Sequence, residues 1–280
     1  MPDRSTLPDS LRLTRIRVYP LKGAAGYDLA DTRLDELGVP LDRRWMLADP
    51  QGDFVSQRTH PRLALLRVRP WDGGVKVEAP GMDPLHLVIP ADSGERTEVR
   101  VFGNPMTAVV HSGEASGWFA DFLSEPFNLV FLPDGAGRDV DPEFAPGHRV
   151  SFADGYPLHL ASESSLEDLN SRLRDAVDMG RFRPNLVVAG GEPWEEDTWR
   201  EVEIGKTRLE LVKPCARCQV TVVDQSSGAL GAEPLKTLGV FRRFQGKVYF
   251  GQNAVLSETG GLRVGDDVRI LKRGSRRPAL

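Results

Sequence analysis

The sequence predicts a mainly β protein with a few helices, arranged in two domains. Short apolar runs, alternating with polar residues and separated by glycine-containing turns, fill the first hundred residues, and similar runs return after residue 185. Long helical periodicity occurs in one stretch, around residue 170. The chain has 280 residues, and a domain takes roughly 150 residues, so we expect two domains.

The composition is that of a folded protein without a polyanionic partner. Hydrophobic residues make up 40% of the chain and charged residues 27%, which argues against wholesale disorder. With 36 Lys and Arg against 40 Asp and Glu, the net charge is −4, so we expect neither nucleic acid nor a membrane surface as partner. The start, Met1–Ser5, lacks a charged-then-apolar signal sequence, and no apolar run is long enough to span a bilayer. We therefore expect a cytoplasmic protein.

The first hundred residues predict three antiparallel strand pairs, each joined by a turn rich in glycine, proline or asparagine. This pattern is typical of an antiparallel barrel or sandwich. The expected pairs are Arg44–Ala48 with Phe54–Ser56, Leu63–Val68 with Val75–Val77, and Glu98–Phe102 with Thr107–Val110.

The spacing of apolar residues changes after His111, from an alternating pattern to a helical one. A short helical pattern runs from Ser116 to Leu123, and we place the domain boundary there, giving domains 1–115 and 116–280. Leu166, Leu169 and Leu173 form one apolar stripe, which predicts a helix over Ser164–Val177 that begins with a Ser164–Glu167 capping box. The remaining apolar segments predict strands over Asn185–Ala189, Glu201–Ile204, Arg208–Val212, Gln219–Val223 and Val268–Leu271. The basic end, Lys272–Arg277, is expected to fray.

The two cysteines of the chain, Cys215 and Cys218, form a Cys-x-x-Cys pair with several interpretations. A zinc site needs four ligands, and the five histidines are scattered. A thioredoxin-like pair needs a helix after the second cysteine, where the sequence predicts a strand. Two buried small apolar side chains remain the simplest alternative. Arg217, between the sulfurs, would favour a thiolate and an anion, which suits a soft metal bound to sulfur.

Basic side chains stand near the ends of predicted strands at three further places. They are Lys22, Arg43 in Leu41–Trp45, and Arg183 in Arg181–Asn185. Arginines at strand ends are commonly solvated. The guanidinium fork nevertheless suits phosphate or a planar heterocycle, so both interpretations stay open.

Seven segments together carry a resemblance to a known family. They are Val18–Gly23, Asp42–Met46, Gln57–Ala64, Arg181–Asn185, Glu196–Trp199, Cys215–Cys218 and Phe250–Asn253. In this order they resemble MOSC proteins with the N-terminal MOSC β-barrel domain, a family that includes mitochondrial amidoxime reducing components and bacterial N-hydroxylaminopurine-detoxifying proteins. The match covers nearly the whole chain and implies a β-barrel-like N-terminal domain packed on a MOSC β-barrel domain.

The resemblance implies a molybdenum cofactor, in which a pterin dithiolene and one cysteine hold molybdenum. Cys218 stands at the position of the metal ligand and catalytic residue, with Arg217 beside it. The other cofactor-binding positions that carry over are Lys22, Arg43, Arg183 and Asn253. The chain also departs from the family: Gly23 stands where relatives often have serine, Gly155-Tyr156 where some have Ser or Thr, and Asn253 where the mitochondrial proteins carry tyrosine.

The implied activity is reduction of small N-hydroxylated compounds, in which R–NH–OH, two electrons and two protons give R–NH₂ and water. A [2Fe–2S] cluster usually needs four cysteines, and Gln219 breaks the signature of attached haem, so we expect a separate ferredoxin- or flavin-type electron donor. No residue identifies itself as the proton donor, and Asp224 suits a turn better. The alternatives are a non-catalytic carrier of the cofactor or its sulfur, and a scaffold that binds no metal.

Overall fold

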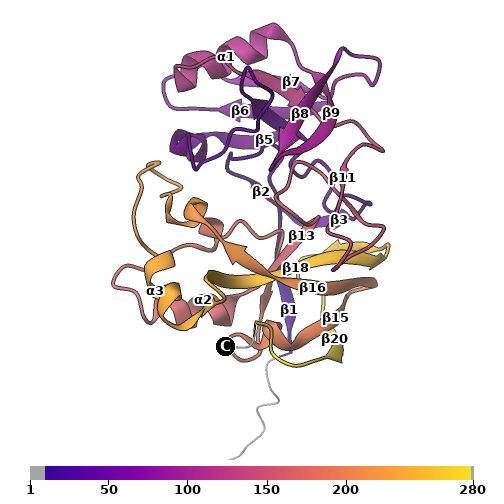
Figure 1. Ribbon diagram of the computed structural model, residues 1–280. Helices are drawn as coiled ribbons and strands as arrows, with labels where there is room; N and C mark the ends of the chain where they lie inside the picture. Colours follow the sequence, from indigo (N-terminus) through magenta and orange to yellow (C-terminus); the bar gives the residue numbers. More distant parts are fainter. Residues whose placement is uncertain (1–9, 279–280) are drawn as a thin grey trace, which may run out of the picture.

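The computed structural model describes residues 10–278, which form two lobes stacked end to end (Figure 1). Strands dominate both lobes, as the sequence predicts, and the few helices lie on their surfaces. The opening Met1–Ser5, for which we expect no signal sequence, lies outside the described residues. Residues 10–278 contain no helix with the length and apolar character needed to cross a membrane.

The lower lobe is built on a sheet of nine strands. Its pairs are antiparallel except for β13 with β14, which run parallel. Alternate apolar side chains point into one core, which includes Leu13, Ile16, Leu160 and Leu186. In sheet order the strands are β2 (Tyr27–Leu29), β1 (Arg12–Val18), β14 (Leu186–Ala189), β13 (Leu158–Ser162), β18 (Lys247–Glu258), β16 (Thr207–Arg217), β15 (Trp199–Ile204) and β20 (Val268–Arg273), with β17 (Arg243–Phe244) beside β18.

The upper lobe contains two smaller sheets and one helix packed around an aromatic core (Figure 1). Trp45 and Phe131 meet edge to face, with ring centroids 4.8 Å apart, and Phe119 from α1 is fully buried beside them. One sheet has the order β4 (Trp45–Ala48), β10 (Asn128–Phe131), β9 (Asn104–Val110), β8 (Arg96–Val101); the other is β5 (Arg67–Trp71), β6 (Gly74–Glu78), β7 (Leu85–Val88); the helix is α1 (Gly113–Leu123).

The chain passes between the lobes more than once. β1, near the N-terminus, pairs with β14 in the lower sheet, whereas β10, after residue 116, pairs with β4 and β9 in the upper lobe. The division into domains 1–115 and 116–280 therefore stays a prediction. Two small ribbons complete the described strands: β3 (Asp31–Arg33) with β19 (Gly261–Arg263), and β11 (Arg138–Asp139) with β12 (Arg149–Val150).

The helix predicted over Ser164–Val177 is shorter in the structure. α2 spans Glu163–Asn170, and the Asn170 side chain then accepts from Val177 N at 2.9 Å and donates to Val177 O at 3.0 Å. These two bonds fold residues 171–177 back towards the end of the helix, so Leu173 and Val177 follow the helix in a turn. The Ser164–Glu167 capping box is wrong, because Ser162 precedes the helix and makes no capping bond with its side chain.

Further expectations differ from the structure. The predicted strand Phe54–Ser56 does not form, and Phe54 makes only an isolated bridge to Ala48. Gln219–Val223 forms the 3-10 helix η4 (Gln219–Val222) in place of a strand, and the first part of Leu63–Val68 lies in η1 (Pro61–Leu65). The basic end is docked, since Arg276 and Arg277 donate to the carbonyls of Trp194 and Val212. The other short helices are η2 (Met179–Arg181), η3 (Glu195–Thr198) and α3 (Leu235–Phe241).

Candidate functional site

A cavity of about 540 Å³ is lined by residues from both lobes. Ser56, Gln57, Arg58 and Phe102 come from the upper lobe, and the lower sheet supplies residues of β13, β16 and β18. All the site residues that the sequence predicts line this one cavity, although they are spread from residue 22 to residue 253: Lys22, Arg43, Arg183, Arg217, Cys218 and Asn253.

The cysteine pair reaches the cavity through an irregular end of β16. The register between β16 and β18 shifts between Leu211 and Lys213 and again between Pro214 and Ala216. Bulges of this kind re-aim side chains and are common beside functional sites. After Arg217 the carbonyl of Cys218 accepts bonds from Thr221 N at 3.1 Å and Thr221 Oγ1 at 2.9 Å, which turns the chain into η4. Both thiols are free and partly exposed.

The Arg217 side chain is held by two hydrogen bonds, one to Cys215 and one to Phe182. Its Nη1 donates to Cys215 Sγ at 2.8 Å, and its Nη2 donates to the carbonyl of Phe182 at 2.8 Å. Burial raises the pKa of the Cys215 thiol, and the nearby guanidinium of Arg217 only partly opposes this. Cys215 therefore serves as a neutral partner that orients Arg217.

Arg43 and Arg183 lie against the ring of Tyr19, with guanidinium carbons 4.4 Å and 4.3 Å from the ring centroid. Arg43 Nη1 also contacts Asp42 at 2.5 Å and Asn185 at 3.3 Å, and Arg183 Nη1 donates to the Ala24 carbonyl at 2.6 Å. Burial, reinforced by the positive charge of Arg43, lowers the pKa of Arg183 to about 10. Arg183 therefore remains charged at neutral pH, beside the guanidinium group of Arg43.

Both of these arginines have left-handed backbones, with φ of +49° at Arg43 and +53° at Arg183. A residue other than glycine is strained at positive φ, and residues with this strain concentrate at functional sites. The strain aims two guanidinium groups into one cavity.

Lys22 is buried and donates to Phe152 O at 2.8 Å and Asp154 Oδ1 at 2.6 Å. Burial lowers the pKa of Lys22, while Asp154 opposes the shift. The pKa of Asp154 lies below its ordinary value, because the charges of Lys22 and Arg58 outweigh the cost of removing its carboxylate from water. Sequence reasoning missed Asp154, which follows no recognisable motif.

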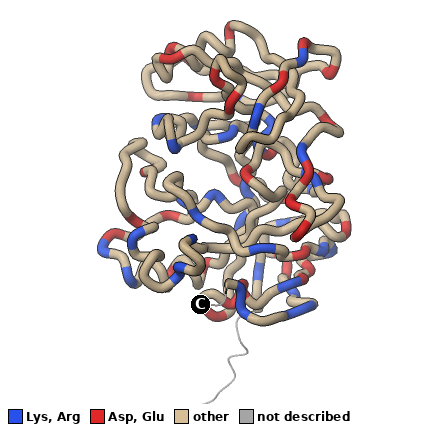
Figure 2. The backbone as a smooth tube through the Cα atoms, viewed as in Figure 1, with Lys and Arg blue, Asp and Glu red and all other residues tan. Residues whose placement is uncertain are grey.

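The cavity has a large excess of positive charge. Among the described residues, its lining includes seven Lys or Arg side chains and a single carboxylate, Asp154. The whole chain has a net charge of −4, so the basic residues are concentrated locally, and Figure 2 shows Lys and Arg on both sides of the level where the lobes meet. Such a cavity favours an anionic ligand.

His159, on β13, also lines the cavity, and the sequence analysis did not single it out. Its ring is buried, and burial together with the charge of Arg217 lowers its pKa well below the ordinary value. The imidazole is therefore neutral. Gly251 faces it with φ of +72°, and a Cβ there would lie 2.5 Å from His159 Nε2. Only glycine lets the two strands approach this closely.

Models of two protein families match the chain, one on each part. Residues 10–126 match the MOSC N-terminal beta barrel domain, and residues 147–269 match the MOSC domain. Mitochondrial amidoxime reducing component 2 from Rattus norvegicus is 34% identical, over 91% of this chain and 82% of its own length. Mitochondrial amidoxime-reducing component 1 from Homo sapiens is 32% identical, over 92% of this chain and 82% of its own length. The Xenopus laevis protein of the same name is 30% identical, over 94% of this chain and 83% of its own length. The chain belongs to the amidoxime reducing component family of MOSC proteins.

The positions at which the resemblance implies a departure from the family differ in the free space around them. Gly23 has φ of +90°, and an added Cβ would lie 2.9 Å from Leu63 Cδ1, so serine would strain this backbone. An added Cβ at Gly155 would meet no atom of residues 10–278 within 4 Å. The hydroxyl of Tyr156 is buried without a hydrogen-bond partner among the described residues, at the wall of the cavity.

Asp224 is a turn residue in this MOSC protein. Its carboxylate accepts bonds from Ser226 and Ser227 and pairs with Arg181 at 2.8 Å, and the serine bonds in particular lower its pKa. It is not part of the described cavity lining. Asp224 is therefore ionised at neutral pH, in the turn role that the sequence favours.

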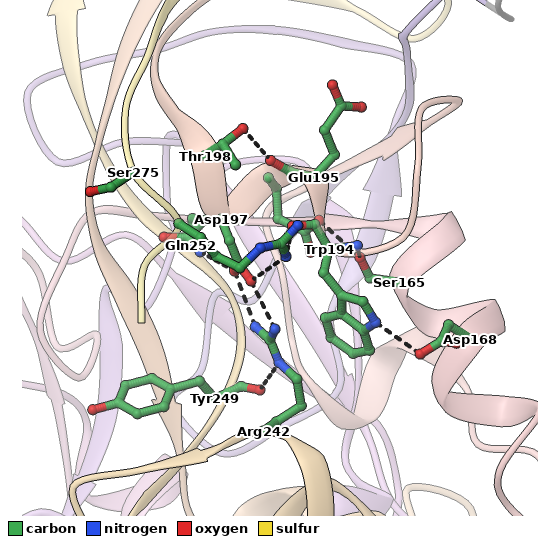
Figure 3. A network of polar contacts seen from close by, with 12 residues as sticks. Ser165, Asp168, Trp194, Glu195, Asp197, Thr198, Arg242, Tyr249, Gln252 and Ser275 are labelled. Atoms are coloured by element: carbon green, nitrogen blue, oxygen red, sulfur yellow. Dashed lines mark hydrogen bonds and ion pairs between the residues drawn. The ribbon is translucent and has the colours of Figure 1, made fainter. Parts of the chain in front are cut away.

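A buried ion-pair network is centred on Asp197 (Figure 3). Arg242 donates to both carboxylate oxygens, at 2.8 Å and 3.1 Å, and Gln252 Nε2 donates at 2.9 Å. Because Gln252 precedes Asn253 on β18, this network fixes the strand that presents Asn253 to the cavity. We call it the Asp197 network.

The residues present suit a molybdenum cofactor. No group of three His, Cys, Asp or Glu side chains that could hold a metal ion occurs within residues 10–278, so a metal bound to Cys218 would take other ligands from the cofactor. A pterin phosphate is a dianion that needs several fixed donors. The excess of cations, and the buried Nε atom of Arg217 without a partner in the described chain, fit such a group.

Proposed function

We propose that this protein reduces small N-hydroxylated compounds with a molybdenum cofactor held in the cavity. The substrate R–NH–OH takes up two electrons and two protons and gives R–NH₂ and water. The observation that carries the proposal is the meeting of Cys218 with a cluster of fixed cations in one cavity. The relatives named amidoxime reducing components support the substrate class.

Each cavity residue has a definite task in this proposal. The Cys218 thiolate would be the protein ligand of molybdenum, and Arg43 and Arg183 would bind the pterin and its phosphate. Lys22, held by Asp154, and Asn253 on β18 would complete the binding site. Arg217, oriented by Cys215 and Phe182, would place a positive charge beside the ligand. When bound, the cofactor supplies the two-electron chemistry, which side chains lack.

Electrons would come from a separate ferredoxin- or flavin-type partner. Two cysteines at one site do not provide the four ligands that an iron–sulfur cluster usually takes. Turnover with NAD(P)H alone, without an added partner, would contradict this part of the proposal. A cytoplasmic location also stays a prediction, and the relatives named above are called mitochondrial.

The first test is the content of molybdenum and pterin per chain after purification from a host that makes the cofactor. We expect about one of each in the wild type and little metal in Cys218→Ala. Cys215→Ser is the matched control, because it keeps an acceptor for Arg217 and should retain the metal. Absence of both from the wild type would overturn the proposal.

The second test is turnover of benzamidoxime with reduced viologen as electron donor. We expect steady reduction by the wild type and none by Cys218→Ala. Bound cofactor without turnover would instead support a carrier of the cofactor or its sulfur.

A further inference from the structure

Phe102 occupies an unusual position at the wall of the cavity. It is the first residue of the two-residue turn between β8 and β9, with φ of +52°, and Gly103 follows with φ of +78°. Asn or Gly usually fills this position, because an aromatic residue is strained in the left-handed region. The Phe102 side chain is nevertheless 45% exposed and lines the cavity. The strain is therefore not offset by burial in the core.

Arg58 lies beside Phe102 and has unused hydrogen-bonding capacity. Its guanidinium carbon is 5.0 Å from the Phe102 ring centroid, and Nη2 lies 3.4 Å from Asp154 Oδ2, a long contact. Its Nε has no hydrogen-bond partner in the described chain. This Nε is itself buried, but the side chain keeps 29% of its surface exposed, and Arg58 lines the cavity.

The other cavity arginines are more fully engaged. Arg217 donates to Cys215 and Phe182 at 2.8 Å, and Arg183 donates to Ala24 at 2.6 Å. Arg58 instead packs against two aromatic rings, since Phe54 lies tilted against Phe102 with ring centroids 4.7 Å apart. The upper lobe thus offers the cavity an exposed aromatic face beside a cation with free donors.

We propose that Phe102 and Arg58 form a substrate subsite that selects flat aromatic N-hydroxylated compounds carrying a carboxylate. The ring of Phe102 would stack on the aromatic part of the substrate, and Arg58 would bind its carboxylate. This inference rests on the proposed function and names the substrate class for it.

The test compares three amidoximes with the cofactor-loaded enzyme and saturating reduced viologen: acetamidoxime, benzamidoxime and 4-carboxybenzamidoxime. We expect kcat/KM to rise in that order in the wild type. Arg58→Gln should remove about a tenfold advantage of the carboxylate, through KM, while kcat for benzamidoxime stays unchanged. Phe102→Leu should reduce the advantage of benzamidoxime over acetamidoxime by about 3- to 10-fold.

Two matched controls lie close in sequence or chemistry but outside the described cavity lining. Arg62→Gln removes a charge four residues from Arg58, and Trp71→Leu removes another exposed aromatic ring of the upper lobe. Both should leave the three kcat/KM ratios unchanged. Equal ratios in the wild type and Arg58→Gln would overturn the subsite, as would loss of molybdenum from Arg58→Gln, because Arg58 would then belong to the cofactor site.

Binding without turnover separates the subsite from the proposed function. Calorimetry of 4-carboxybenzamidoxime without an electron donor should give about a tenfold weaker Kd for Arg58→Gln than for the wild type. If no amidoxime is reduced but this difference persists, the proposed function fails and the subsite stands. If reduction proceeds without any preference, the subsite fails and the proposed function stands.

Discussion

The cavity and the Asp197 network are both rich in arginine, but their charges are matched differently. In the network, the buried carboxylate of Asp197 receives both arms of Arg242, the amide of Gln252 and a contact from Arg276 at 3.3 Å. In the cavity, seven Lys and Arg side chains line the wall with one carboxylate, Asp154, and behind the lining only Arg43 and Lys213 meet a further carboxylate, Asp42 and Asp141. A buried charge without a partner is costly. The network is therefore complete by itself, whereas the cavity is built to be completed by an anion.

The largest expected effect comes from breaking the network. Asp197→Ala would leave Arg242, which is 3% exposed, without its partner, and this should lower the free energy of unfolding by about 3–5 kcal/mol. Urea unfolding of the cofactor-free protein measures it. Asp92→Ala, which breaks the exposed pair with Arg96, is the control, with an expected change of about 1 kcal/mol or less. Equal losses of unfolding free energy in Asp197→Ala and Asp92→Ala would contradict the view that the buried network contributes more than an exposed ion pair.

The next effect concerns Glu196, beside Asp197. Burial, together with the negative charge of Asp197, raises the pKa of Glu196 to about 7. One of its oxygens accepts from Ser165 at 2.8 Å, and the other has no partner within residues 10–278. Between its unfolded and folded pKa values the folded state binds the extra proton. The stability that Glu196 contributes is therefore lost as pH rises towards and through 7.

The measurement is the free energy of unfolding of the wild type and Glu196→Gln from pH 5 to pH 8. The free energy of unfolding of Glu196→Gln, relative to that of the wild type, should rise by about 2–3 kcal/mol over this range. Glu195→Gln, which alters the neighbouring carboxylate that pairs with Arg273, should show no such gain. A constant difference between wild type and Glu196→Gln would show that Glu196 does not titrate in this range.

The smallest expected effect on stability comes from the cavity. Arg183→Met loses one bond to Ala24 but also removes repulsion with Arg43. The unfolding free energy of the cofactor-free protein should change by about 1 kcal/mol or less. Cofactor retention should nevertheless fall at least about tenfold, measured as molybdenum kept after dialysis. Arg181→Met, two residues away and paired with Asp224, should retain the metal. Similar loss in both variants would contradict the assignment of Arg183.

Local patterns determined much of the fold. Alternating apolar residues and a glycine turn predicted the β8–β9 hairpin, because a strand with one buried face must alternate. The pairing of Arg44–Ala48 with a strand over Phe54–Ser56 is wrong, since β4 pairs with β10 instead. The helical pattern at Ser116–Leu123 is confirmed as part of α1. The same logic failed at Gln219–Val223, where a strand-like composition forms η4 because Thr221 bonds back to Cys218. It also failed after Asn170, whose side chain clamps Val177.

The sequence by itself determined a first set of candidate residues, since the order of its motifs brought Lys22, Arg43, Arg183, Arg217, Cys218 and Asn253 together, and all six line the cavity. Only the tertiary structure decided how that set is arranged. Asp154, His159 and Phe102 join it from parts of the chain that no local pattern marks, and Arg58 joins it from the segment Gln57–Ala64, whose residues received no role from the sequence. The balance of charge is likewise a property of the assembled cavity, because the partner of a buried charge is chosen by folding and not by sequence neighbours.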